Sequence, residues 1–483
     1  MKIKSKLFSV LILSAFIFIS CDDFNEIDPP VKDQISGSAD FSRYVALGNS
    51  ITAGYQSGTL YQSAQQYSYA ALIAKQTGTK FEAPFVSDPG LGGRLEVQSL
   101  SPFTLYTNKD QGSLLNANYP GPYTNLGVPG ALTYDILFAK SSTTCASYVF
   151  SGTPNPYFDI ILRNSVLNLG TPLEQALGQA PSFITLWIGN NDVLGYATSG
   201  GTSPSAPTPI ANFQQLYGGI AQGLSQYVAQ TGSKVVVANI PSVTAIPFFT
   251  TVGPQIATNP NVPWASLPLG FVYQRAGESG IGNGSATQNN LLTGAVLITL
   301  TGSSYAPLLG QPTGKFYRDY KFPALPAGVD TTKPFGFHPQ NPWPNAFILD
   351  PDEITIANNA VNSFNAIISG LATNFNFGLV NINSVFNQFR AADFTGGTVI
   401  NGITFKTTYV QGGLFSLDGV HPSSQAHGIV ANEFIKVINS KYGANIPLVD
   451  VSAIPGSIYL HKSVQMENGY YVIPSSAFEH LLF

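Results

Sequence analysis

The stretch RYVALGNSITAGY, residues 43–55, decides the fold. Its apolar part predicts a short β-strand that stops at Gly48, and Ser50 follows at the strand exit, between Gly48 and Gly54. Four further short apolar runs follow along the chain: one that ends near Val128, and residues 182–189, 234–241 and 378–386. They are rich in Val, Ile and Leu with little polar alternation, which is typical of strands buried on both faces of a parallel sheet.

Helical patterns lie between these strands, at residues 68–78, 213–232, 350–372 and 423–443. The third has Asp350 as a candidate N-cap, Pro351 at the first helical position and acidic residues in its first turn. Alternation of strands and helices predicts an α/β doubly wound sheet with right-handed crossovers. The segments at 89–122 and 242–348 lack such a pattern, so we expect them to be large loop insertions.

The N-terminus has the pattern of an export signal. Three lysines precede an apolar run at residues 7–20, which is too short to span a bilayer and suits a signal peptide. Residues 18–21, FISC, resemble a bacterial lipobox, although Phe18 departs from its usual small aliphatic residue. We therefore expect lipidation at Cys21 and a lipoprotein anchored in the cell envelope, on the outer membrane. An ordinary signal peptide cut elsewhere, or an uncleaved anchor, is the alternative.

The expected organisation is a signal peptide at residues 1–20, a flexible tether at 21–40, one domain at 41–443 and a C-terminal extension at 444–483. The only other cysteine, Cys145, has no basic cluster beside it, so we expect a buried apolar residue and not a nucleophile.

Composition excludes several classes of partner. Only 10% of the 483 residues are charged and the formal net charge is −4, so no basic stripe for nucleic acid is visible. No dinucleotide or P-loop fingerprint is complete, and we expect no cofactor. Asp350, Asp352 and Glu353 suit helix capping better than metal binding, so we expect no metal site.

A serine needs a base to become a nucleophile, and the chain offers five histidines. His421, in SLDGVHPSSQAHG, differs from the other four because Asp418 precedes it by three residues in a loop before a helix. Such an aspartate can accept the Nδ1 proton, which leaves Nε2 free to take a proton from a serine. The others are His338, in a Pro-rich insertion, His427, in the last helix, and His461 and His480, in the tail.

Two further stretches could stabilise an oxyanion. After the second strand, NLGVPGALTYD places Gly130 where its backbone N–H is unobstructed. After the third strand, IGNNDVLG offers the side-chain amide of Asn191. Because ligands of open α/β sheets bind at the carboxyl ends of the strands, we expect Ser50, Gly130, Asn191 and the Asp418/His421 pair to converge.

The four stretches resemble blocks I, II, III and V of the SGNH hydrolases, the GDSL-type lipases and esterases. The resemblance assigns the nucleophile to Ser50 in GNSIT and the catalytic pair to Asp418 and His421 in DGVHP. It assigns the oxyanion hole to Ser50, to Gly130 in VPGALT and to Asn191 in GNND. It also implies a flavodoxin-like three-layer sandwich around a parallel sheet of about five strands, and hydrolysis of esters.

One position departs from the family pattern: Asn49 precedes the nucleophile where the family usually has Asp. Acyl transfer to a sugar hydroxyl, deacetylation of glycans, or glycan binding without catalysis on the same scaffold are the alternatives, the last supported by Asn49 and by the aromatic residues of the 242–348 insertion. We also expect that insertion to shape the pocket for the acyl or leaving group.

Overall fold

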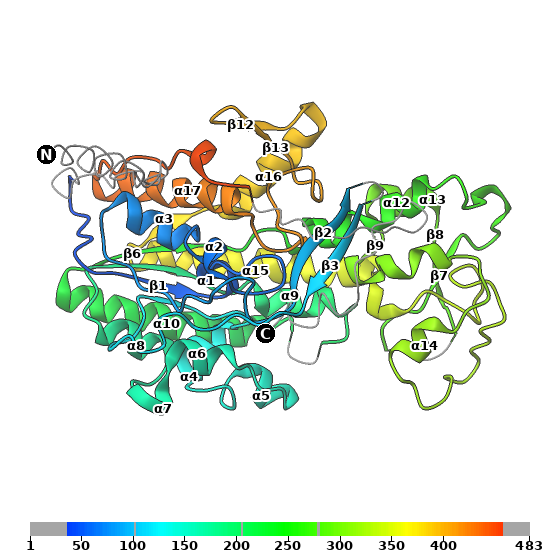
Figure 1. Ribbon diagram of the computed structural model, residues 1–483, viewed down its shortest axis with the longest axis horizontal. Coiled ribbons are helices and arrows are strands. Elements are labelled where there is room, and N and C mark those ends of the chain that lie inside the picture. Colours follow the sequence, from blue (N-terminus) through cyan, green and yellow to red (C-terminus); the bar gives the residue numbers. More distant parts are fainter. Residues whose placement is uncertain (1–35, 101–102, 204–205, 278–280, 457–483) are drawn as a thin grey trace, which may run out of the picture.

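The computed structural model describes residues 36–100, 103–203, 206–277 and 281–456 of the 483. Its centre is a five-stranded parallel sheet of order β11-β6-β5-β1-β4 (Figure 1). The strands are β1 (Tyr44–Gly48), β4 (Asn125–Gly127), β5 (Phe183–Trp187), β6 (Lys234–Ala238) and β11 (Gly378–Val380). This confirms the expected α/β fold with a central parallel sheet of five strands.

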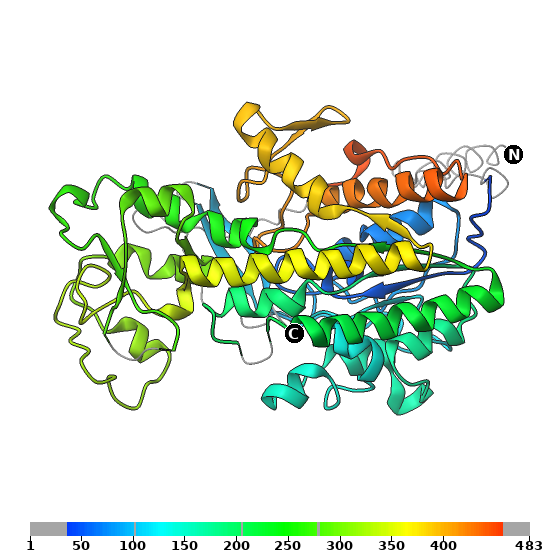
Figure 2. The ribbon, with the colours of Figure 1, turned by 180° about the vertical axis from the view of Figure 1, so that it is seen from behind.

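Successive side chains of each strand pack against helices on opposite faces of the sheet. On one face Val45, Ile184 and Val237 join a cluster with Phe213 and Phe364, whose rings stack 3.8 Å apart. These two rings belong to the long helices α10 (Ile210–Thr231) and α15 (Pro351–Asn374), which run side by side in Figure 2. The same face carries α4 (Thr133–Phe138), α6 (Tyr157–Leu162) and α8 (Pro172–Gly178).

The other face is covered by α3 (Tyr69–Gln76) and α17 (Ser424–Tyr442). Tyr44 and Phe183 of the sheet pack here with Tyr69 and Phe434, whose rings stack 4.7 Å apart. The three layers are thus helices, sheet and helices.

Local signals set the ends of the helices. Asp350 caps α15 by accepting from the backbone N–H groups of Asp352 and Glu353, as its position predicts. Ser423 and Gly443 bound α17, and Gly232 ends α10 in the left-handed conformation.

The predicted strand at residues 378–386 is wrong beyond its third residue. Only β11 is extended, and α16 (Ile382–Ala392) follows directly. The physical reason is the Asn381 side chain, which accepts from the Ser384 N–H and caps α16. Ile382, Phe386 and Phe389 then recur at helical spacing on the buried side of that helix.

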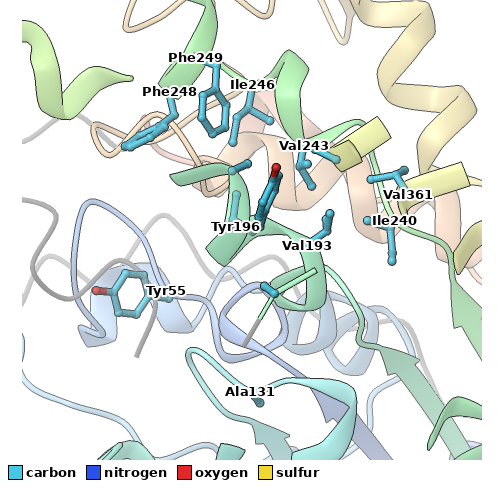
Figure 3. Packing of buried hydrophobic residues seen from close by; sticks show 14 of the residues in the cluster. Tyr55, Ala131, Val193, Tyr196, Ile240, Val243, Ile246, Phe248, Phe249 and Val361 are labelled. Carbon is cyan, nitrogen blue, oxygen red and sulfur yellow. The ribbon is translucent and has the colours of Figure 1, made fainter. Parts of the chain in front are cut away.

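The two insertions contain regular structure that their sequences did not reveal. Residues 89–122 hold an antiparallel hairpin of β2 (Arg94–Leu100) and β3 (Phe103–Asn108). Residues 242–348 begin with α11 (Pro247–Thr250) and α12 (Val252–Thr258), and Ile246, Phe248 and Phe249 pack into the main core near Tyr196 (Figure 3). The rest forms a lobe at one end of the molecule (Figure 1), with α13 (Gln288–Thr293), α14 (Lys315–Asp319), β7 (Phe271–Tyr273), β8 (Gly284–Ala286), β9 (Leu297–Ile298) and β10 (Ile348–Leu349).

Both ends of the described chain lie against α17. The Ser38 N–H donates to the Tyr442 carbonyl over 2.8 Å, and Asn432 exchanges two hydrogen bonds with the backbone of Val449. Across the residues placed by the structure, no helix is both long enough and apolar enough to cross a bilayer.

Candidate active site

Three loops begin next to one another at the carboxyl edge of the sheet. The register pairs Gly48 of β1 with Gly127 of β4 on one side and with Trp187 of β5 on the other. The segments with Ser50, Gly130 and Asn191 therefore start side by side, with that of Ser50 in the middle. Glycine is required here, because a Cβ on Gly48 would lie 2.1 Å from Thr52 Oγ1 and one on Gly127 2.4 Å from the Ala53 nitrogen.

Ser50 is the first residue of the short helix α1 (Ser50–Ala53). Asn49 caps this helix, since its Oδ1 accepts from the Ile51 N–H over 3.1 Å. An aspartate side chain could accept in the same way, so the change from Asp to Asn at this position keeps the cap. Its Nδ2 is buried and has no hydrogen-bond partner among the described residues.

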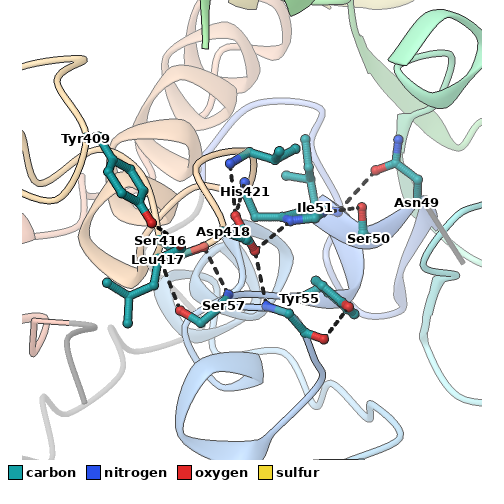
Figure 4. Close-up of polar contacts among 12 residues, drawn as sticks. Asn49, Ser50, Ile51, Tyr55, Ser57, Tyr409, Ser416, Leu417, Asp418 and His421 are labelled. Carbon is teal, nitrogen blue, oxygen red and sulfur yellow. Dashed lines mark hydrogen bonds and ion pairs between the residues drawn. The ribbon is translucent and has the colours of Figure 1, made fainter. Parts of the chain in front are cut away.

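Ser50, His421 and Asp418 form a chain of two hydrogen bonds (Figure 4). His421 Nε2 lies 2.8 Å from Ser50 Oγ, and His421 Nδ1 lies 3.0 Å from Asp418 Oδ2. All three are buried, with 5%, 2% and 0% of Ser50, His421 and Asp418 exposed. The structure thus brings His421 to Ser50 across 371 residues of sequence.

The surroundings of Asp418 favour its ionised form. Burial alone would raise its pKa, but the charge of His421 and hydrogen bonds from His421 and Val420 lower the pKa below its ordinary value. Asp418 Oδ1 accepts from the N–H groups of Val420 and His421, each over 2.9 Å, and Oδ2 also accepts from the Gly58 N–H. A fixed carboxylate holds the imidazole in the tautomer that presents a bare Nε2 to Ser50.

Gly130 and Asn191 lie on two loops that are tied together. Gly130 has a φ of +78° in a turn closed by the bond from Ala131 N–H to the Val128 carbonyl. Asn191 Nδ2 donates to the Ala131 carbonyl over 3.0 Å. An amide group has two N–H bonds, so this contact orients the side chain and leaves the second N–H available to a ligand.

Asp192 strengthens the same tie, and the sequence reasoning did not give it a role. Its Oδ2 accepts from both the backbone N–H and the hydroxyl of Thr133, and its Oδ1 accepts from the Thr208 hydroxyl. Burial raises the pKa of Asp192 to about 6, against the lowering effect of these donors. The sequence feature that could have pointed to Asp192 is its place directly after Asn191 in GNND.

Ser57 clamps the loop that carries the histidine, and no sequence pattern indicated it. Its N–H donates to Ser416 Oγ over 3.0 Å, and its Oγ accepts from the Leu417 N–H over 3.2 Å (Figure 4). Its carbonyl accepts from the Leu95 N–H of β2, so the first insertion supports the clamp. Ser57 is fully buried with a φ of +48°, a conformation that a serine adopts only under constraint.

The other candidates lie apart from this arrangement. Cys145 is buried, as expected, and its Sγ contacts the Ser142 carbonyl. His427 is buried in α17, where desolvation lowers its pKa to about 3 and keeps it neutral. His338 accepts from the Gln340 N–H in the second insertion. Within the described ranges, no three His, Cys, Asp or Glu side chains gather as a metal site would require, and Cys21, His461 and His480 lie outside those ranges.

A comparison with protein families identifies the family of the chain. The family model described as GDSL-like Lipase/Acylhydrolase matches residues 44–281 and 308–434, which is more than half of the chain. The chain belongs to this family. The match spans all the segments that converge at Ser50. A comparison with curated proteins gave no match.

Solved structures give distant likenesses. An alpha/beta hydrolase enzyme from the metagenome of Lake Arreo is 11% identical, with 83% of this chain and 95% of that chain covered and a TM-score of 0.31. A lipase/acylhydrolase from Enterococcus faecalis is 11% identical, covering 84% and 100%, with a TM-score of 0.29. Phospholipase A1 from Streptomyces albidoflavus is 14% identical, covering 82% and 98%, with a TM-score of 0.29.

Because Ser57 holds the loop that carries His421, we expect a substitution of Ser57 to lower the reactivity of Ser50. Ser57→Ala leaves the buried Leu417 N–H without its acceptor, which should cost about 1–3 kcal/mol of unfolding free energy. It should also slow the labelling of Ser50 by a serine-directed phosphonate by about tenfold, because His421 is held less firmly. Urea unfolding and labelling rates measure the two effects.

Ser57→Gly is the matched control, since it removes the same hydroxyl but suits the positive φ. It should slow labelling as much as Ser57→Ala while losing less stability. Normal labelling in both variants would show that the clamp does not position His421.

Proposed function

We propose that this protein is a serine ester hydrolase that cleaves carboxylic esters through an acyl-enzyme. The observation that carries the proposal is the chain of hydrogen bonds from Asp418 through His421 to Ser50, at the edge where the loops of Gly130 and Asn191 emerge. The family is one of ester hydrolases, which supports the same reaction class.

In the proposed acylation, Ser50 Oγ forms a bond to the ester carbonyl carbon while its proton moves to His421 Nε2. The carbonyl oxygen becomes an oxyanion. His421 then gives the proton to the alcohol oxygen as the carbon–oxygen bond of the ester breaks, and the alcohol leaves. Asp418 remains ionised throughout and stabilises the imidazolium.

In the proposed deacylation, water gives a proton to His421 Nε2 and its oxygen bonds to the acyl carbon. His421 then returns the proton to Ser50 Oγ as the bond between Oγ and the acyl carbon breaks, which releases the acid and restores Ser50. Three donors would stabilise the oxyanion in both steps: the Ser50 N–H, the Gly130 N–H and the Asn191 amide. The Ser50 N–H suits this role because the first N–H groups of a helix have no acceptor within the helix.

The nucleophile is tested by Ser50→Ala and His421→Ala. Either change should lower kcat for 4-nitrophenyl esters on the order of 10⁴-fold or more, because neither residue works without the other. Ser151→Ala, an exposed serine on α5 (Ala146–Ser151), is the control and should match the wild type. Full activity in Ser50→Ala, with phosphonate labelling at another residue, would refute the assignment.

The oxyanion role is tested by Asn191→Ala. This change should lower kcat by roughly 10²–10³-fold with a smaller change in KM, because the lost hydrogen bond is strongest to the transition state. Asn190→Ala is the matched control, since Asn190 is the adjacent amide and caps α9 (Asn191–Thr198) without a side-chain hydrogen bond. An effect on KM alone would assign Asn191 to substrate binding instead.

We further propose that lipid on Cys21 anchors the enzyme in the cell envelope, on the outer membrane. The lipobox-like stretch FISC supports this proposal. Ser36 and Ser38 bond to the last turn of α17, beside the edge of the sheet where β1 begins. An anchor that leads into this edge would leave the edge with Ser50 pointing away from the membrane.

Cys21→Ser tests the anchor. The wild-type protein should fractionate with membranes and carry a lipid mass on its N-terminal peptide, whereas the variant should lack that mass, because the diacylglyceryl group is attached through a cysteine sulfur. Cys145→Ser controls for loss of a cysteine. The same N-terminal mass and the same fractionation in wild type and Cys21→Ser would contradict the proposal.

A further inference from the structure

An apolar pocket of about 100 Å³ lies between α16, the start of α17 and the loop that carries His421. One wall is a stripe of α16, made of Ile382, Val385, Phe386 and Phe389 at spacings of three and four. These four side chains share one face of the helix. That face borders the pocket, while Asn387 and Gln388 on the other side are exposed.

The pocket begins beside the catalytic pair. Ile51, which lines it, directly follows Ser50. Val420 and Pro422, which also line it, stand on either side of His421. The sequence neighbours of both reacting residues therefore form part of the apolar lining, which places the pocket beside the Ser50–His421 pair.

The residues that line the pocket determine which kind of chemical group it can bind. Every residue along the pocket is apolar, including Trp187 at the end of β5 and Leu414 and Phe415 before the histidine loop. A sugar placed there would leave its hydroxyl groups without partners, which is costly in a dry site. An acetyl group would leave most of the stripe without a contact. Hydrocarbon is the chemistry that such a surface stabilises.

We propose that this pocket receives the hydrocarbon tail of the acyl group, so that the enzyme prefers acyl chains longer than acetyl. The inference rests on the proposed ester hydrolysis and names its substrate class. It assigns the preference to α16 and to the residues flanking Ser50 and His421. Ile246 is the one residue of the 242–348 insertion along its wall.

Val385→Phe tests the preference by narrowing the pocket. The ratio of kcat/KM for 4-nitrophenyl hexanoate to that for the acetate should fall about tenfold, because the longer chain loses apolar contact that acetate never makes. Gln388→Phe adds the same ring to the exposed side of α16 and should keep the wild-type ratio. An unchanged ratio in Val385→Phe, with activity that still depends on Ser50, overturns the pocket while ester hydrolysis stands.

A binding measurement separates the pocket from the reaction. Brominated hexanoate should quench the fluorescence of Trp187 in Ser50→Ala, since Trp187 lines the pocket and the other two tryptophans, Trp264 and Trp343, lie in the insertion. Val385→Phe and Trp187→Phe should each lose that quenching. If no ester is cleaved but quenching persists, the proposed function fails and the pocket holds. Quenching that survives in Trp187→Phe places the tail elsewhere and overturns the inference.

Discussion

The common carboxyl edge of the parallel sheet is the constraint on which the rest of the site depends. Parallel strands in register end at one level, so the residues that follow them become neighbours whatever their distance in sequence. Here Gly48, Gly127 and Trp187 share that level. Ser50 therefore emerges between the loops of Gly130 and Asn191 without any long-range signal other than strand pairing.

His421 lies on a loop outside the sheet, so strand pairing does not position it. Polar contacts orient its ring. The Tyr55 ring lies 4.8 Å from the His421 ring, and Leu417 of the same loop is buried in the core, but apolar contacts are not directional and do not aim Nε2 at Ser50. Gly58 and Ser57 supply the fixing bonds from the segment that follows α1. Ser50 and His421 are thus held by the same stretch of chain, residues 50–58, and a shift of that stretch moves both.

The parts of the fold and the site that depend on local pattern could be predicted from the sequence. The strand before Ser50, the cap at Asp350 and the Asp418/His421 spacing each follow from a few adjacent residues. The misassigned segment at residues 381–386 shows the limit, because NINSVF has the apolar content of a strand and only the capping bond of Asn381 makes it a helix. Ser57 could not be found at all, since its partners lie 359 and 360 residues away in sequence.

The same limit applies to the insertion at residues 242–348, whose role in specificity stays a prediction. Aromatic and proline residues at 242–348 suggested a wall for the substrate pocket, but most of them pack with one another: Trp343 lies among Phe271, Phe335 and Phe347. An isolated lobe needs such a cluster to be stable, because a small unit buries little surface otherwise. Two parts of the insertion reach the histidine loop: the Phe248 N–H donates to the Gly419 carbonyl, and the Leu300 side chain lies beside Gly419. Much of the aromatic content therefore stabilises the lobe, whereas one wall of the proposed acyl pocket is formed by α16, the helix whose apolar content predicted a strand.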